Sequence, residues 1–373
     1  SSLVVQVDVR TGRCRSFRMP RPAEGPWGME FTLDGHVLVT STGGHLVRIN
    51  PRTGRAWITA NPGKWLWAID RGADGKFYLG SSPVCGLFRY DAATEKLEDL
   101  GSLDPTQKYL RTVVAGRDGY IYGSVGCTAA QVVAYHIASG RTQALLPKFE
   151  EQPNFQGLGR GRDGKPCVRT VLGNTYRLEH GEAFPAGDSR RKNGGEEMHL
   201  DVLPERLPDG RPLTRLDPDA VRVGEGPRAR IIRLKYETDG ANIFHLAEGP
   251  NQAVYASTIM PLYLVRYTPA ARKLENLGRG APDNGEAYSV GHCGGKLYYG
   301  CYSYGNLMEY DPAKPLHRDP PGAMKWKDNP RLVSPLGKGH NRPRAMCVDS
   351  RQRVWVGSFA EYGLSNGGLG CYD

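Results

Sequence analysis

The stretch at residues 75–101, GKFYLGSSPVCGLFRYDAATEKLEDLG, contains the pattern that decides the fold. Runs rich in aromatic and alternating residues, separated by turn residues, predict three strands, at residues 76–80, 87–90 and 96–100. A more apolar run at residues 66–70 supplies a further strand just before them. Four short strands in about 40 residues predict one blade of a β-propeller.

The same unit recurs along the whole chain. A two-residue turn follows the first strand of each unit, and it is rich in Gly, Asn and Asp because these residues accept a positive φ at the lowest cost. The turns lie at residues 34–35, 74–75, 118–119, 163–164, 209–210, 251–252, 294–295 and 351–352. This periodicity predicts an all-β fold, a single β-propeller with eight four-stranded blades favoured and seven as the alternative.

We expect residues 1–373 to form one domain. Residues 183–240 are the weakest repeat, which is either a blade or an insertion, and residues 311–335 hold an inserted proline-rich loop. Two expected strands near the N-terminus are predicted to pair with the C-terminal blade, because such closure leaves no exposed strand edge.

The net charge of +10 suggests an anionic partner, and nucleic acid, an acidic polysaccharide and simple solubility are each consistent with it. Because no long Lys/Arg run marks a nucleic-acid tail, we expect an acidic polysaccharide or oligosaccharide and no nucleic acid. No apolar run approaches 18 residues, so we expect no membrane partner. The eight cysteines form no CxxC pair, which argues against structural zinc. We expect a secreted or periplasmic protein whose signal peptide has been removed.

Candidate site residues come from the loops that share one rim of a propeller, namely those before the first strands and those between second and third strands. This rim changes from blade to blade and is rich in Lys, Arg, His, Tyr and Asn. The selected catalytic residues are His245, Tyr288, Tyr302 and His340. The selected substrate-binding residues are Lys64, Trp65, Arg111, Asn154, Asn242, Tyr304, Arg342, Arg344 and Tyr362.

These residue types suit β-elimination from a uronic acid. Arg, Lys or Asn donors neutralise the carboxylate beside C5 and thereby make the C5 proton acidic. A His or Tyr removes that proton, and a second one returns a proton to the leaving oxygen. The sequence therefore predicts a polysaccharide lyase for an acidic glycan that requires no cofactor, with a divalent metal ion left open.

Other interpretations of the same residues stay open. His245 fits a core histidine beside Phe244 as well as a catalytic group, and Trp27 and Trp67 fit a packing layer as well as a sugar platform. The protein as a whole also fits a non-catalytic propeller that binds a glycan or a protein. A metal-dependent hydrolase of the lactonase type would need carboxylates and an Asn on the rim, for which Glu286, Glu361, Asn154 and Asn242 are the candidates.

The repeat framework resembles that of streptogramin B lyases, of the gluconolactonase-like superfamily and of propeller polysaccharide lyases that act on ulvan or on rhamnose–glucuronate glycans. The resemblance is carried by GKFYLG at residues 75–80 and LFRYD at residues 87–91, and its pattern covers nearly the whole chain. It implies elimination chemistry with His or Tyr as proton carriers, sometimes with a metal ion nearby. Framework motifs specify the fold and not the site, so the resemblance transfers no catalytic residue.

Overall fold

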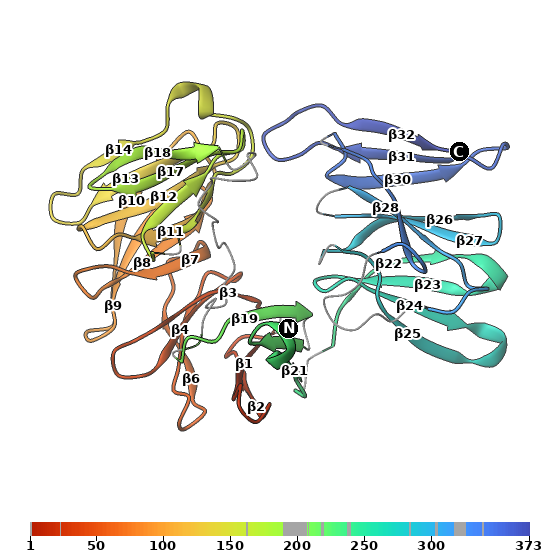
Figure 1. The fold of residues 1–373 in the computed structure, drawn as a ribbon, viewed down its shortest axis with the longest axis horizontal. Coiled ribbons are helices and arrows are strands. Elements are labelled where there is room, and N and C mark those ends of the chain that lie inside the picture. The colour runs from red at the N-terminus through yellow and green to blue at the C-terminus, as the bar shows by residue number, and fades with distance from the viewer. Residues whose placement is uncertain are drawn as a thin grey trace. The chain divides into compact units, whose positions relative to one another are not determined.

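The computed structural model describes residues 2–22, 24–161, 163–188, 207, 209–217, 220–236, 240–282, 285–302, 305–316, 326–337 and 339–373. This part of the chain forms nine antiparallel sheets, six with four strands, two with three and one with two (Figure 1). In each sheet the strands follow one another in chain order, which is the arrangement of propeller blades. The predicted all-β, blade-built fold is confirmed, whereas the number of blades stays a prediction.

The chain divides into two compact units, an N-terminal unit of residues 1–214 and 221–239 and a C-terminal unit of residues 215–220 and 240–373. The N-terminal unit contains four four-stranded sheets, three within residues 26–144 and the fourth within residues 157–188. Their strands are β3 (Pro26–Phe31), β4 (Val37–Ser41), β5 (Leu46–Ile49) and β6 (Ala56–Ala60); β7 (Trp65–Arg71), β8 (Phe77–Ser82), β9 (Gly86–Asp91) and β10 (Lys96–Ser102); β11 (Tyr109–Ala115), β12 (Tyr120–Gly126), β13 (Gln131–His136) and β14 (Thr142–Ala144); and β15 (Gly157–Arg160), β16 (Pro166–Arg169), β17 (Asn174–Glu179) and β18 (Glu182–Asp188).

The C-terminal unit contains two four-stranded sheets and the last three-stranded sheet. Their strands are β22 (Ile243–Glu248), β23 (Val254–Thr258), β24 (Tyr263–Thr268) and β25 (Lys273–Arg279); β26 (Ala287–Cys293), β27 (Lys296–Cys301), β28 (Asn306–Tyr310) and β29 (Arg331–Pro335); and β30 (Arg342–Val348), β31 (Val354–Phe359) and β32 (Gly368–Tyr372). Four 3-10 turns occur at η1 (Lys148–Glu150), η2 (Gly226–Arg228), η3 (Pro250–Gln252) and η4 (Pro269–Ala271). No helix in the described ranges is long and apolar enough to cross a membrane.

The two remaining sheets bear on the predictions for the weakest repeat and the chain ends. Within the weakest repeat, residues 183–240, the structure has a three-stranded sheet of β19 (Leu213–Asp217), β20 (Ala220–Val223) and β21 (Arg230–Arg233). The N-terminal strands β1 (Leu3–Val7) and β2 (Cys14–Arg18) pair with each other. Closure by pairing of this hairpin with the C-terminal blade stays a prediction, as does the single domain. The last five residues of the expected inserted loop, 331–335, form β29, which pairs with β28, so the segment between the two strands is residues 311–330.

The recurring turn does more than reverse the chain. Gly75 and Gly119 have φ values of 76° and 84°, as the sequence predicts for this turn. The aspartate before each glycine accepts a hydrogen bond from a tyrosine on the following strand, over 3.0 Å from Tyr78 and 2.8 Å from Tyr122. Both tyrosines are fully buried, so the turn also satisfies a hydroxyl group that would otherwise be costly to bury.

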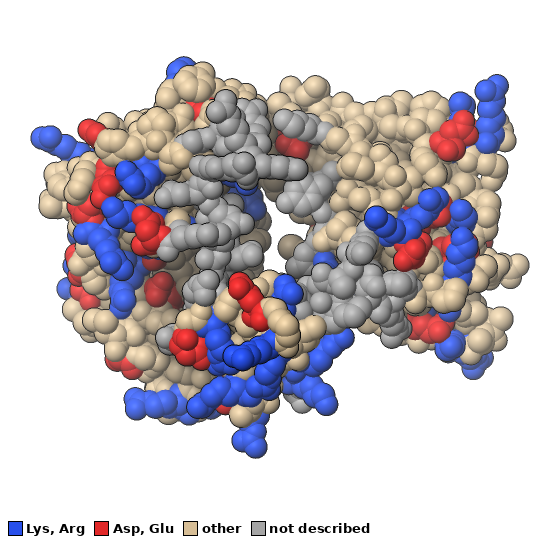
Figure 2. Space-filling model, viewed as in Figure 1, with Lys and Arg blue, Asp and Glu red and all other residues tan. Residues whose placement is uncertain are grey.

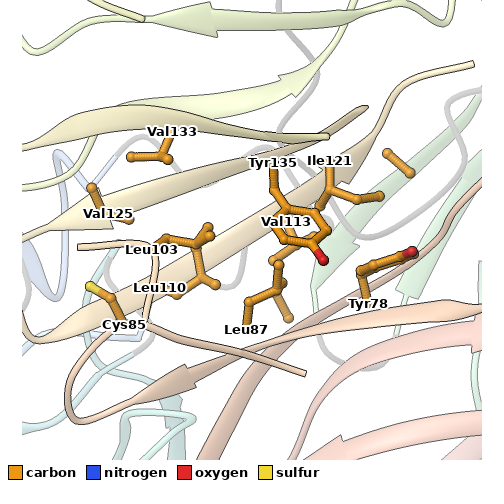
Figure 3. Packing of buried hydrophobic residues seen from close by; sticks show 12 residues of the cluster. Tyr78, Cys85, Leu87, Leu103, Leu110, Val113, Ile121, Val125, Val133 and Tyr135 are labelled. Atoms are coloured by element: carbon orange, nitrogen blue, oxygen red, sulfur yellow. The ribbon is translucent and has the colours of Figure 1, made fainter. Parts of the chain in front are cut away.

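Successive sheets of the N-terminal unit pack face to face through apolar side chains. Figure 3 shows Tyr78 and Leu87 from one sheet and Leu110, Ile121 and Tyr135 from the next converging on one cluster. Burial of side chains of this size contributes about 1.5–3 kcal/mol each, so this contact accounts for much of the cohesion between blades. Each sheet therefore needs a neighbour to cover its faces.

Candidate functional site

The first strand of several sheets carries one residue more than the strand it pairs with. In the C-terminal unit the register shifts between Ile243 and His245, between Ala287 and Ser289, and between Arg342 and Ala345. The extra positions hold Phe244 in β22, Tyr288 in β26 and Pro343–Arg344 in β30. An extra residue of this kind bends the strand and re-aims a side chain, which is a common way of presenting functional groups.

These re-aimed side chains contact one another across three consecutive sheets. The ring centroids of Phe244 and Tyr288 lie 5.1 Å apart in an edge-to-face arrangement. The Arg344 Cζ atom lies 4.6 Å from the centroid of the Tyr288 ring and 5.6 Å from that of Phe359. Arg344 and Phe359 are both exposed, so a solvent-facing guanidinium group is held over an aromatic surface.

A second set of contacts continues from Tyr288. Its ring lies 6.1 Å from the ring of Tyr302, which follows β27. The hydroxyl oxygens of Tyr302 and Tyr362 are 3.0 Å apart, and Arg342 Nη2 donates a hydrogen bond to the Tyr362 hydroxyl over 2.7 Å. Arg342 Cζ also lies within 4.8 Å of both ring centroids. We call Tyr288, Tyr302, Tyr362, Arg342 and Arg344 the tyrosine–arginine cluster.

Close packing of two sheets brings the cluster together. The Ser289 hydroxyl donates a hydrogen bond to the Pro343 carbonyl over 2.7 Å, which ties β26 to β30. A Cβ atom placed at Gly300 would lie 2.7 Å from the Pro343 ring, so only glycine allows β27 to approach β30 this closely. The Tyr302 backbone N–H donates to the Glu286 carbonyl over 3.0 Å and so fixes the position of Tyr302.

Glu286 is a buried carboxylate beside the cluster. Only 4% of its surface is exposed, and its Oε2 atom accepts no hydrogen bond from the described residues. Burial raises the pKa of Glu286, while Tyr288, Arg342 and Arg344 oppose this shift. Burial, and then the nearby Glu286, raise the pKa of Tyr288. The catalytic role expected for Tyr288 stays a prediction, and its ring packs against the Arg344 guanidinium.

The two candidate histidines lie in different surroundings. Burial lowers the pKa of both His245 and His340, so both are neutral at pH 7. His340 Nδ1 lies 2.8 Å from the Ser358 hydroxyl, and its Nε2 lies against Gly368, so the ring is packed inside its own sheet. His245 is half-buried in β22. Its neighbour Phe244 is the residue whose ring contacts Tyr288. The catalytic roles expected for both histidines stay predictions.

The remaining candidates fall in three places. Asn242 is exposed just before β22 in the C-terminal unit, and Tyr304 lies outside the described residues. The other candidates, Lys64, Trp65, Arg111 and Asn154, belong to the N-terminal unit. There, Lys64 Nζ lies 4.0 Å from Asp99 Oδ2, and Asn154 is held at the edge of a sheet by its hydrogen bond to the Cys127 carbonyl.

Sequence reasoning did not select Phe244 or Phe359 as site residues, and it considered Glu286 only as a metal ligand. Phe244 could have been found by aligning the first strands of the repeats. The extra residue of β22 is Phe244, and the equivalent extra residue of β26 is the selected Tyr288. Phe359 carries no comparable signal, because it ends a regular strand.

Positive charge gathers on the N-terminal hairpin. Five arginines but only one acidic residue, Asp8, lie in residues 2–22, and all five arginines are exposed. They are Arg10, Arg13, Arg15, Arg18 and Arg21. Arg15 Nη1 donates to the Pro51 carbonyl over 2.5 Å, which brings the hairpin beside the exposed Arg52 and Arg55. Figure 2 shows Lys and Arg side chains concentrated where Figure 1 draws β1, β2 and β6.

The described residues contain no group of three or more His, Cys, Asp or Glu side chains placed to hold a metal ion. Glu286 lies beside two arginines, which is an unfavourable surrounding for a cation.

Comparison with known proteins shows similarity at the level of the fold. A scan against protein-family models finds no match, and neither does a search of curated proteins. A catalytically inactive virginiamycin B lyase from Staphylococcus aureus, determined with quinupristin, is 12% identical with a TM-score of 0.41 and covers 80% of this chain and 84% of its own. A streptogramin B lyase is 12% identical with a TM-score of 0.36 and coverages of 95% and 96%. The WD40 β-propeller domain of Doa1 is 11% identical with a TM-score of 0.38 and coverages of 75% and 90%.

At these identities and TM-scores, the likenesses transfer neither an activity nor a site residue to this chain.

Proposed function

We propose that the tyrosine–arginine cluster is the active site of a lyase that cleaves a uronate-containing acidic glycan by β-elimination. The observation that supports this most directly is the pair of hydroxyls of Tyr302 and Tyr362, 3.0 Å apart beside the Arg342 guanidinium. Two phenols in contact can take up one proton and release another within a single site. The exposed Arg344 supplies the cationic group that a uronate carboxylate requires.

In this reaction Arg344 binds the uronate carboxylate. When C5 loses its proton, negative charge spreads onto that carboxylate, and a guanidinium group placed there stabilises it. The aromatic rings of Tyr288 and Phe359 hold the Arg344 side chain from two sides and limit its movement. Orientation of this kind before the reaction lowers the barrier without further reorganisation.

The two tyrosines carry the proton. The Tyr362 oxygen, which accepts a hydrogen bond from Arg342 Nη2 over 2.7 Å, takes up the C5 proton while its own hydroxyl proton passes to Tyr302 across their 3.0 Å contact. The electron pair left behind forms the C4–C5 double bond as the C4–O bond breaks, and Tyr302 gives its hydroxyl proton to the leaving oxygen. Both tyrosines carry a hydroxyl proton again after this relay, so the starting state is restored. The net change is a proton moved from C5 to the leaving sugar.

The test is incubation of the protein with a panel of uronate polysaccharides, read by the ultraviolet absorbance of an unsaturated uronate product. We expect Tyr302→Phe and Tyr362→Phe to lower kcat about 100-fold, because each removes a proton-carrying hydroxyl. We expect Arg344→Ala to raise KM and to lower kcat about 10-fold or more, since it removes charge stabilisation.

Matched controls keep the test specific. Tyr267→Phe removes an exposed tyrosine hydroxyl on β24, and Arg351→Ala removes an exposed arginine next to the β30–β31 turn. Both should keep the rate of the unaltered protein. Full activity of a folded Tyr362→Phe variant, or the absence of unsaturated product with every uronate polymer, would rule the proposal out.

A second candidate function is a glycan-binding propeller without turnover. Exposed aromatic side chains favour it, since Phe359, which contacts Arg344, is 59% exposed and Phe244, which contacts Tyr288, is 38% exposed. This function predicts binding of the same glycans, loss of binding in Arg344→Ala, and no product in either case. Both functions concern an acidic polysaccharide, so we propose a secreted or periplasmic protein.

A further inference from the structure

The N-terminal unit contains a row of side chains built in the same way as the candidate site. The register shifts between Pro26 and Met29 in β3, between Leu66 and Ala68 in β7, and between Leu110 and Thr112 in β11. The extra positions hold Trp27–Gly28, Trp67 and Arg111. In both units, therefore, three consecutive first strands present an aromatic residue, a second aromatic residue and an arginine.

The members of this row contact one another as their counterparts do. The ring centroids of Trp27 and Trp67 lie 4.5 Å apart, and Arg111 Cζ lies 5.7 Å from the Trp67 ring. Two further rings extend the row, because Tyr109 contacts Trp67 at 5.9 Å and Phe155 contacts Tyr109 at 5.6 Å. Arg111 Cζ also lies 4.8 Å from the Phe155 ring. We call Trp27, Trp65, Trp67, Tyr109, Arg111 and Phe155 the tryptophan row.

Two indoles of the row are open to solvent. Trp27 is 37% exposed, and Trp65, whose ring lies 6.0 Å from that of Trp67, is 54% exposed. Large aromatic surfaces left exposed in a folded protein commonly mark binding sites. Arg111 is also exposed, and no acidic side chain belongs to the row.

The chemistry of the row suits an acidic sugar. The flat indole faces of Trp27 and Trp65 can cover the C–H face of a pyranose ring, and the Arg111 guanidinium can bind its carboxylate in a bidentate manner. Indoles neither take up nor release a proton near neutral pH, and the row contains one tyrosine, Tyr109, in place of the two hydroxyl groups in contact that carry the proton in the tyrosine–arginine cluster. The arrangement is therefore suited to holding a sugar and not to cleaving it.

We infer that the tryptophan row is a second sugar-binding site, which holds a uronate residue of the same class of glycan without reacting with it. This inference rests on the proposed function for the identity of the glycan, and it adds an anchoring site in the N-terminal unit. A long substrate chain offers many uronate residues, so a second site raises the effective concentration of the chain at the protein.

Calorimetric titration with a short, saturated uronate disaccharide tests the inference. The Tyr362→Phe variant is used throughout, so that its turnover, expected to be about 100-fold slower, interferes little with the binding measurement. We expect two disaccharides bound per protein. Arg111→Ala or Trp65→Ala should weaken one binding event about 10-fold and leave the other unchanged, whereas Arg344→Ala should weaken only the other. Phe184→Ala and Arg177→Ala are the matched controls, since both remove exposed side chains from the sheet β15–β18.

A neutral disaccharide of the same size separates stacking from charge recognition. It should bind the tryptophan row more weakly than the uronate, and Arg111→Ala should not change its affinity, while Trp65→Ala should reduce it about 10-fold. A single binding event that only Arg344→Ala removes would overturn the second site and leave the proposed lyase intact. Two binding events with no unsaturated product from the unaltered protein would instead overturn the lyase and leave the second site intact.

Discussion

At the scale of single residues, two buried glutamates of the C-terminal unit show how surroundings decide ionisation. Burial raises the pKa of Glu286, and the arginines near it do not fully offset this effect. Burial acts on Glu309 in the same direction, but hydrogen bonds from Arg331, Tyr298 and Lys296 outweigh it and lower its pKa to about 2. Arg331 donates to both carboxylate oxygens of Glu309, over 2.7 and 2.9 Å.

Glu309 should therefore control part of the acid stability. Its pKa is lower in the folded protein than in the unfolded chain, so its contribution is present above pH 4.5 and is lost as the pH falls toward about 2. Glu309→Gln should lower the free energy of unfolding at pH 7 by about 2 kcal/mol, because charged hydrogen bonds are lost. It should also flatten the fall of stability between pH 4.5 and about 2, which chemical denaturation at several pH values measures.

Glu98→Gln is the control for this prediction, since Glu98 pairs with Arg89 but half of its side chain is exposed. Exposed pairs contribute little, so this variant should stay within about 0.5 kcal/mol of the unaltered protein. A Glu309→Gln variant with an unchanged pH dependence of unfolding would contradict the assigned role.

At the scale of elements, the distance between neighbouring sheets depends on glycines that occupy equivalent places in the repeats. Gly80 in KFYLGS and Gly357 in RVWVGS hold the same position of the repeat. A Cβ atom at Gly80 would lie 2.6 Å from the Leu110 carbonyl oxygen, whereas one at Gly357 would meet only the Ala345 side chain at 3.7 Å. Two neighbouring sheets therefore approach each other closely at Gly80, whereas Gly357 has room for a methyl group.

Gly80→Ala should therefore destabilise the protein by about 1–3 kcal/mol, because β8 and β11 must move apart to accept the methyl group. Gly357→Ala, the matched variant in β31, should have an effect of less than about 1 kcal/mol. Thermal unfolding of the two variants measures the difference. Equal losses of stability would show that the close approach at β8 and β11 does not limit the packing.

At the scale of the whole molecule, the excess of positive charge should govern association with an acidic glycan. The exposed arginines of the N-terminal hairpin account for part of the net charge of +10. The arginines of the tyrosine–arginine cluster and of the tryptophan row add local positive charge. Attraction between such charges and a polyanion is screened within about 8 Å at physiological salt. Charge of this kind changes the association rate more than the dissociation rate.

The affinity for a uronate polymer should fall about fivefold or more when salt rises from about 0.05 M to 0.5 M. The affinity for a neutral polymer should stay nearly constant over the same range, because stacking on aromatic rings is not screened. Substitution of Arg10, Arg13 and Arg18 by Ser should reduce the salt dependence without changing the elimination rate on a disaccharide. Binding of the uronate polymer that ignores salt would contradict an electrostatic contribution.

The sequence by itself determined the strands, the turns and the class of fold. Strand alternation and Asp-Gly turns are local properties, which depend on neighbours a few residues apart. The repeat at residues 75–101 shows both, and the same pattern recurs along the chain. The basic, tyrosine-rich rim was also visible in the sequence, and so were Tyr288, Tyr302, Arg342, Arg344 and Tyr362 as candidates.

Only the tertiary structure decided which candidates meet. Tyr302 and Tyr362 are 60 positions apart in the chain, and their contact depends on the packing of two sheets and on the extra residues in β26 and β30. Packing between other sheets, those of β7 and β11, sets Arg111 and Trp65 in a separate row of the N-terminal unit. Contacts of this kind arise from the register and spacing of distant strands, which local patterns of residues do not encode.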